Sequence, residues 1–150
     1  MSGLIRVRRS EIWRDAISLA KNMYELSARW PTDERFGLIS QVRRAAVSVS
    51  ANLAEGAGRD TPGEIARFGR IALGSLYEVD SLLEVASTLS DIDPPSPQIR
   101  QGLVELAKRI ECYVAHHEGR QRNRVREDDA LSYAAAGCDQ DPEPRTQDPD

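Results

Sequence analysis

The chain is poor in the residues that build β-sandwiches and disulfide frameworks. Aromatic residues form 5% of its 150 residues, and Cys112 and Cys138 are its two cysteines. Few aromatics beside many alanines, leucines, isoleucines and valines favour a helical protein. Two cysteines do not form a disulfide framework, so we expect free thiols in a reducing compartment, with Cys112 buried and Cys138 exposed.

Long apolar runs are missing as well. No run reaches the roughly 18 apolar residues of a membrane-spanning helix. The first thirteen residues, MSGLIRVRRSEIW, carry arginines without the apolar core of a secretory signal. These absences predict a soluble, cytoplasmic protein with no membrane partner.

The charge is nearly balanced in the body of the chain. The formal net charge is −4. Residues 1–118 hold 15 basic and 16 acidic side chains, whereas residues 119–150 hold 5 basic and 8 acidic side chains. The body therefore has no global field that attracts nucleic acid, although a local basic patch remains open.

The sequence also lacks the usual patterns of an active site. It has no phosphate-binding loop, no CxxC pair and no serine-nucleophile motif. A di-iron bundle needs Glu-x-x-His on two helices, and the only histidines, His116 and His117, are adjacent and point about 100° apart. We therefore expect no catalytic residue, no metal, no cofactor and no small-molecule substrate, and we predict that the protein is not an enzyme.

The feature that organises the sequence is the segment 41–59, QVRRAAVSVSANLAEGAGR. Val42, Ala46, Val49 and Leu53 recur at spacings of four, three and four residues, which indicates one apolar face of a helix. The rest of the chain is expected to pack around this helix.

Apolar periodicity and end signals predict four amphipathic helices. Ser10 is a plausible N-cap, Thr61-Pro62-Gly63-Glu64 reads as a capping box, and Ser96-Pro97 starts the last helix. The predicted helices cover residues 10–29, 32–57, 61–90 and 97–117. Gly69 and Gly74 inside the third helix suggest close backbone approach, Gly74 to the second helix or to another subunit.

These helices predict an all-α fold, an antiparallel up-down four-helix bundle, because short loops force neighbours to run in opposite directions. The bundle is expected to span residues 10–118. Residues 1–9 are predicted to be a frayed basic arm. Residues 119–150 are predicted to be a charged, mostly disordered tail, with a short helix possible at 127–136.

A polar stripe runs beside the apolar face of the second helix, and two interpretations of it remain open. An internal hydrogen-bond network, with Glu55 paired to Arg59 or Arg44, is preferred over a recognition surface. The third helix can contribute Ser75 and Glu78. The stripe consists of Arg44, Ser48, Asn52, Glu55, Arg59, Ser75 and Glu78.

A second candidate surface is basic. Arginine side chains suit phosphate, so the surface is either a nucleic-acid contact or an ordinary solvated face in which Glu64 pairs with Arg67. No aromatic residues interleave with the arginines in the sequence, so a base-stacking platform is not predicted. The candidates are Arg43, Arg44, Arg59, Arg67 and Arg70.

Residues 11–90 carry the pattern of a known family. The chain resembles the bacterial four helix bundle protein family, also called the large-subunit 23S rRNA intervening-sequence protein family, which is related to the accessory variability protein of diversity-generating retroelements. The residues that carry the resemblance are Trp13, Ala16, Tyr24, Pro31, Glu34, Phe36, Gly37, Leu38, Gln41, Arg43, Arg44, Ala45, Ala46, Ser48, Asn52, Glu55, Gly56, Arg59, Arg67, Phe68, Ala72, Gly74, Ser75 and Glu78.

The resemblance implies a left-handed bundle that assembles as a ring-shaped homopentamer without enzyme activity. It assigns the polar stripe a structural or subunit-contact role. It also implies an alternative, an accessory factor that binds RNA or a reverse transcriptase through arginines of the second and third helices. The acidic net charge and the tail depart from the family pattern.

Apolar residues outside the main core faces, Ile39, Val47, Ile71 and Leu73, are expected to be available for self-association.

Overall fold

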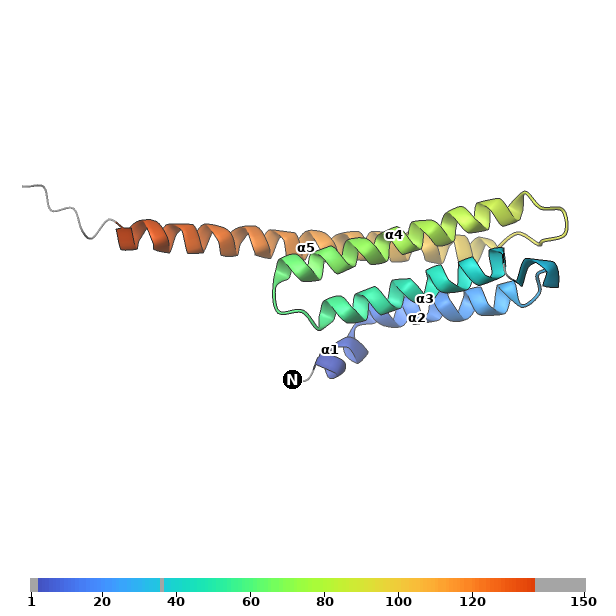
Figure 1. The fold of residues 1–150 in the computed structure, drawn as a ribbon, viewed down its shortest axis with the longest axis horizontal. Helices are drawn as coiled ribbons and strands as arrows, with labels where there is room; N and C mark the ends of the chain where they lie inside the picture. Colours follow the sequence, from blue (N-terminus) through green and yellow to red (C-terminus); the bar gives the residue numbers. More distant parts are fainter. Residues whose placement is uncertain (1–2, 36, 137–150) are drawn as a thin grey trace, which may run out of the picture.

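The structure, a computed structural model, describes residues 3–35 and 37–136 and is all-helical over these ranges (Figure 1). The predicted all-α class is confirmed. The elements are α1 (Gly3–Arg9), α2 (Glu11–Ser27), the 3-10 turn η1 (Thr32–Arg35), α3 (Leu38–Ala57), α4 (Pro62–Ser87) and α5 (Pro97–Ala136).

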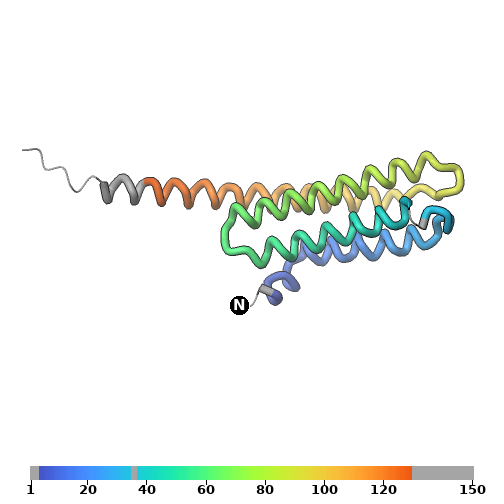
Figure 2. Tube along the Cα trace, in the orientation of Figure 1, coloured from blue at the N-terminus to red at the C-terminus, as the bar shows by residue number. Residues whose placement is uncertain are grey.

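Four long helices, α2 to α5, lie side by side, and successive helices run in opposite directions (Figure 1). The most extensive packing is between α3 and α4, and α5 returns to contact α2. The tube in Figure 2 shows that α5 extends well beyond the turn between α3 and α4. At 40 residues, α5 is about 60 Å long, against about 39 Å for the 26 residues of α4.

The core lies where the apolar periodicity placed it. Val42, Ala46 and Val49 are completely buried, and Leu53 is almost so. The expectation that Ile39 lies outside the core is wrong, because its side chain is 8% exposed and packs in the core cluster. Leu73 is partly buried against the same cluster.

The predicted starts of α2 and α4 have capping bonds. The backbone N–H of Trp13 donates to Ser10 Oγ at 3.4 Å, and that of Glu64 donates to Thr61 Oγ1 at 3.3 Å. The Thr61 hydroxyl donates in turn to the Glu64 carboxylate at 2.8 Å. These side chains satisfy backbone donors that a helix start leaves without a partner.

The segment predicted as one helix over 32–57 is instead divided into η1 and α3. The Glu34 carboxylate accepts a hydrogen bond from the backbone N–H of Leu38 at 3.2 Å and so caps α3. A Cβ at Gly37 would lie 2.7 Å from Glu34 Oε2. The glycine therefore leaves room for this cap, and the helix begins after it.

The chain also differs from the prediction at both ends. Residues 3–9 form α1, which packs on α2 and α3 and buries Val7, in place of a frayed arm. The last helix does not end at residue 117 but continues to Ala136, because Gly119 alone does not break it. Residues 137–150, including Cys138, lie outside the described residues.

The bundle does not end at the predicted boundary after residue 118. Gln121 Oε1 accepts a hydrogen bond from the backbone N–H of Gly63 at 3.2 Å, and Glu118 forms an ion pair with Arg70. The start of α4 is therefore capped by α5 beyond that boundary. Within the described ranges, none of the helices is both long enough and apolar enough to cross a membrane.

Three surface features differ from their predictions. The Cys112 thiol, expected to be buried, is exposed. Ile17 and Tyr24, which share the predicted apolar face of α2, are also largely exposed. The buried stripe of α2 instead passes through Ala16, Leu19, Met23, Leu26 and Ser27.

Two buried glycines allow the helices to approach closely. A Cβ at Gly56 of α3 would lie 2.9 Å from Phe68 Cβ of α4, and one at Gly69 of α4 would lie 2.7 Å from Val114 Cγ2 of α5. Gly74, which the sequence suggested for this role, has no neighbouring atom within 4 Å of such a Cβ. Within the chain, close approach therefore depends on Gly56 and Gly69.

We predict that Gly56→Ala lowers the free energy of unfolding by about 1–3 kcal/mol, because the methyl group overpacks the α3–α4 contact. Gly102→Ala is the matched control, since its Cβ meets open space. The control is expected to raise the free energy of unfolding by up to about 1 kcal/mol, through helix propensity. Urea denaturation followed by circular dichroism measures both, and equal effects of the two variants would contradict the prediction.

Candidate functional site

A short hydrogen-bond chain joins the middle of α3 to the middle of α4. Asn52 Nδ2 donates to Ser48 Oγ at 3.0 Å, and the Ser48 and Ser75 hydroxyls lie 2.9 Å apart. The Ser75 hydroxyl donates to the backbone oxygen of Ile71 at 3.1 Å, so the Ser48 hydroxyl is the donor to Ser75. Each hydroxyl then donates once and accepts once, which leaves no hydroxyl proton without a partner.

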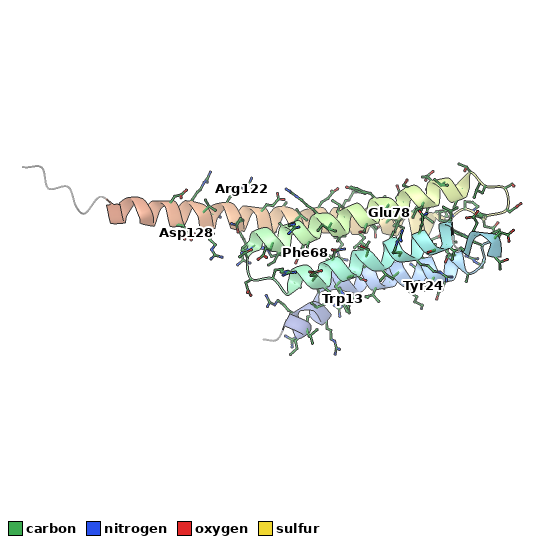
Figure 3. All side chains as sticks on the ribbon, viewed as in Figure 1. Trp13, Tyr24, Phe68, Glu78, Arg122 and Asp128 are labelled. Atoms are coloured by element: carbon green, nitrogen blue, oxygen red, sulfur yellow. The ribbon has the colours of Figure 1, made fainter. Side chains whose placement is uncertain are left out.

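The remaining members of the polar stripe lie outside this chain of bonds. Arg59 pairs with Glu55 at 2.5 Å, and its guanidinium stands 4.8 Å from the ring centre of Phe68. Arg44 and Glu78 are exposed on α3 and α4, and Glu78 and Phe68 are labelled in Figure 3. The stripe thus divides into a half-buried serine–asparagine network and an exposed set of charges.

The five predicted arginines do not form one patch. Arg43 faces α2, where its Nε donates to Ser27 Oγ at 2.8 Å and its guanidinium lies 4.7 Å from the Tyr24 ring centre. Arg70 is paired with Glu118. Arg67 stands 5.9 Å from the Phe68 ring centre. Arg43 is therefore a link between α2 and α3.

The fold assembles two other basic grooves, each with a volume of about 550 Å³. The α4–α5 groove has Arg67, Arg70 and Arg122 in its walls, with Glu118 as its one acidic side chain. Arg122 is labelled in Figure 3. The α1–α5 groove is lined by arginines from three parts of the chain and by Asp60 and Glu127. Its arginines are Arg6, Arg59, Arg120 and Arg124.

A smaller pocket of about 240 Å³ lies beside the α1–α5 groove and contains residues of all five helices. Trp13, Tyr113 and His117 are in its walls, and the Tyr113 and His117 rings meet edge to face at 4.6 Å between centres. Burial raises the pKa of the Tyr113 hydroxyl, and Arg6 partly opposes this effect. Burial also lowers the pKa of His117, as do the nearby charges of His116 and Arg120.

The sequence analysis did not predict that these residues form one pocket. One signal was present, because Tyr113, His117, Arg120 and Arg124 recur at spacings of four, three and four residues. The aromatic residues that seemed separate from the arginines are brought beside Arg6 and Arg120 by α1 and α5. Among the described residues, no group of three or more His, Cys, Asp or Glu side chains is placed to hold a metal ion.

Residues 8–111 match the family described as 23S rRNA-intervening sequence protein. The match covers more than half of the chain, so the chain belongs to this family, and the resemblance seen in the sequence is confirmed. It includes the serine–asparagine network, whereas Tyr113, His117 and the arginines at 120–126 lie beyond it. A search of curated proteins finds no match to the chain.

We predict that Ser48 and Ser75 stabilise the fold as a coupled pair. Ser75→Ala is expected to lower the free energy of unfolding by about 1 kcal/mol, because the half-buried Ser48 hydroxyl loses its acceptor. The double variant Ser48→Ala/Ser75→Ala is expected to lose less unfolding free energy than the two single variants lose together. The difference, which is the coupling energy between the two serines, is expected to be about 0.5 kcal/mol or more. Urea denaturation of the four proteins in a double-mutant cycle measures this coupling. Strictly additive effects would show that the Ser48–Ser75 hydrogen bond contributes nothing to the free energy of unfolding.

Proposed function

We propose that this member of the 23S rRNA-intervening sequence protein family is a non-catalytic interaction module that assembles into a homo-oligomer. The resemblance of the sequence favours a pentamer. One observation carries the proposal: α4 presents a bare glycine between exposed apolar side chains. Gly74 has open space around it, and Ile71 and Tyr77 lie three residues before and after it.

Gly74 makes no stabilising contact within one chain, although the Tyr77 hydroxyl beside it donates to Glu111 of α5 at 3.0 Å. A glycine inside a helix destabilises it by about 1 kcal/mol relative to alanine, and Gly74 gains no contact in return. Ile71 is 41% exposed, and Val47 of α3 is 44% exposed. The Ser48–Ser75 bond joins α3 to α4, and the Ser75 hydroxyl also donates to the backbone oxygen of Ile71. A second copy that packs here would use the close approach that Gly74 permits and would cover apolar area.

Native mass spectrometry with charged variants tests self-association. The wild type is expected to appear as a multiple of the 16.7 kDa subunit, ideally five. Ile71→Glu is expected to weaken assembly by at least about tenfold, because an unpaired charge would be buried at the contact. Val104→Glu on α5, also at an exposed apolar position, is the matched control and should leave assembly unchanged. A wild type that is mostly monomeric at micromolar concentration would exclude the proposal.

The second candidate function is RNA binding, which is favoured by the α4–α5 groove. Three arginines face one glutamate there, so the groove is locally basic although the whole chain carries −4. The family's name connects it with a 23S rRNA intervening sequence. Arginine side chains bind phosphate through paired N–H groups, so this groove suits a nucleic-acid backbone.

For RNA binding, we predict a steep loss of affinity with salt that depends on this groove. The variant Arg67→Gln/Arg122→Gln should reduce the slope of log affinity against log salt by roughly 0.7–0.9 for each lost phosphate contact. Arg100→Gln is the control, because Arg100 pairs with Glu84 near the start of α5, far along the helix from this groove. Structured RNA in a fluorescence anisotropy titration gives the slopes. Binding that is absent, or that does not respond to salt, would rule out this function.

A further inference from the structure

The pocket at the junction of the five helices shares no residue with the apolar surface around Gly74. Its lining includes the buried apolar side chains of Leu53 and Ile65. Its walls carry the side chains of Trp13, Tyr113 and His117. Trp13 is labelled in Figure 3, on α2 close to α1. Pockets with apolar and aromatic walls and a few polar groups are the usual form of small-molecule sites.

The pocket adjoins the α1–α5 groove, because Arg6, Ile65 and Arg120 belong to the walls of both. The groove adds Arg124 and Asn123 beyond the pocket mouth. Among the described residues, Arg6, Arg120 and Arg124 form no ion pair. A ligand that fits both spaces therefore has a flat apolar part and an anionic part.

His117 contributes an imidazole ring to the pocket wall. Its Nδ1 atom is shielded from solvent and makes no hydrogen bond within the described part of the chain. The lowered pKa of His117 keeps the imidazole neutral at neutral pH, so the ring has one donor and one acceptor nitrogen. Heterocycles with N–H and C=O groups suit such a ring.

We propose that this pocket binds the base of one unpaired nucleotide, with the phosphate held at its mouth by Arg6 and Arg120. The volume of about 240 Å³ is below the roughly 300 Å³ of the smallest common ligand sites, so it suits a single planar ring system with the ribose and phosphate outside. Aromatic side chains stack on bases of every type. The site gives the RNA-binding candidate a specific contact and does not depend on self-association.

A free mononucleotide and an unpaired nucleotide within RNA present the same chemistry, so the test uses both. Calorimetry is run on the full chain with the four nucleoside 5′-monophosphates, with adenosine, with inorganic phosphate and with a single-stranded RNA hexamer. A nucleotide is expected to bind at least about tenfold more tightly than either adenosine or phosphate, because only the whole molecule occupies both spaces.

Two variants locate the binding. Arg120→Ala is expected to weaken binding by about tenfold through loss of a charge-assisted hydrogen bond. Ala57→Leu at the pocket wall is expected to abolish binding by filling the space. Arg100→Ala is the matched control, because this arginine lies on the same helix, pairs with Glu84 and lines neither the pocket nor either basic groove. Circular dichroism and native mass spectrometry check that the variants keep their fold and assembly.

Each outcome decides the question. Mononucleotide binding that Ala57→Leu abolishes supports the proposal with a free nucleotide as ligand. Binding of the hexamer alone, again abolished by Ala57→Leu, supports it with a nucleotide in a strand. Binding that neither Ala57→Leu nor Arg120→Ala alters, or no binding of any nucleotide, overturns it. Failure of the assembly test would leave this result unaffected, because assembly is measured separately.

Discussion

The close contact between α3 and α4 determines much of the remaining structure. It requires a glycine at position 56, where any side chain would meet Phe68, and it carries the bond between Ser48 and Ser75. Because hydrogen bonds are directional, the two serines fix the register of α3 on α4 more narrowly than apolar packing does. Arg43 extends the same constraint to α2 through Ser27. A few short polar contacts, placed at different levels along α3, thus help to position three helices.

The length of α5 is the second determinant, and it explains where the basic residues gather. Gly69 lets α5 lie close to α4, and Gln121 caps the start of α4. The helix then continues past the turn between α3 and α4 (Figure 1). Near this turn it contributes Arg120 and Arg124 to one groove and Arg122 to the other. Residues 122–129 are all exposed. An acidic chain can therefore present basic grooves, because the net charge does not describe the local field.

The sequence predicted the helices well wherever local signals decide them. Val42, Ala46, Val49 and Leu53 repeat at the helical period and are all buried, and the Thr61 cap begins α4. The end of α5 was missed because its polar, arginine-rich composition resembles that of a disordered tail, although it contains few helix breakers. The helical spacing was enough to predict that Ser48 and Asn52 lie on one stripe. It could not predict that Arg6 lies beside Arg120, because that proximity depends on which helices pack together, and no local sequence pattern specifies this.

The proposed self-association surface overlaps the α4–α5 groove but not the pocket of Trp13, Tyr113 and His117. Ile71 belongs both to the apolar surface around Gly74 and to the α4–α5 groove, so a neighbouring subunit would stand at the edge of that groove. RNA bound there would then contact the assembly as a whole, and its affinity would depend on the oligomeric state. The pocket of Trp13, Tyr113 and His117 shares no residue with this surface, and its α5 residues lie beyond the segment matched by the family. The proposed assembly and the proposed nucleotide binding therefore use different residues: the apolar surface lies within the matched segment, and the pocket depends in part on residues beyond it.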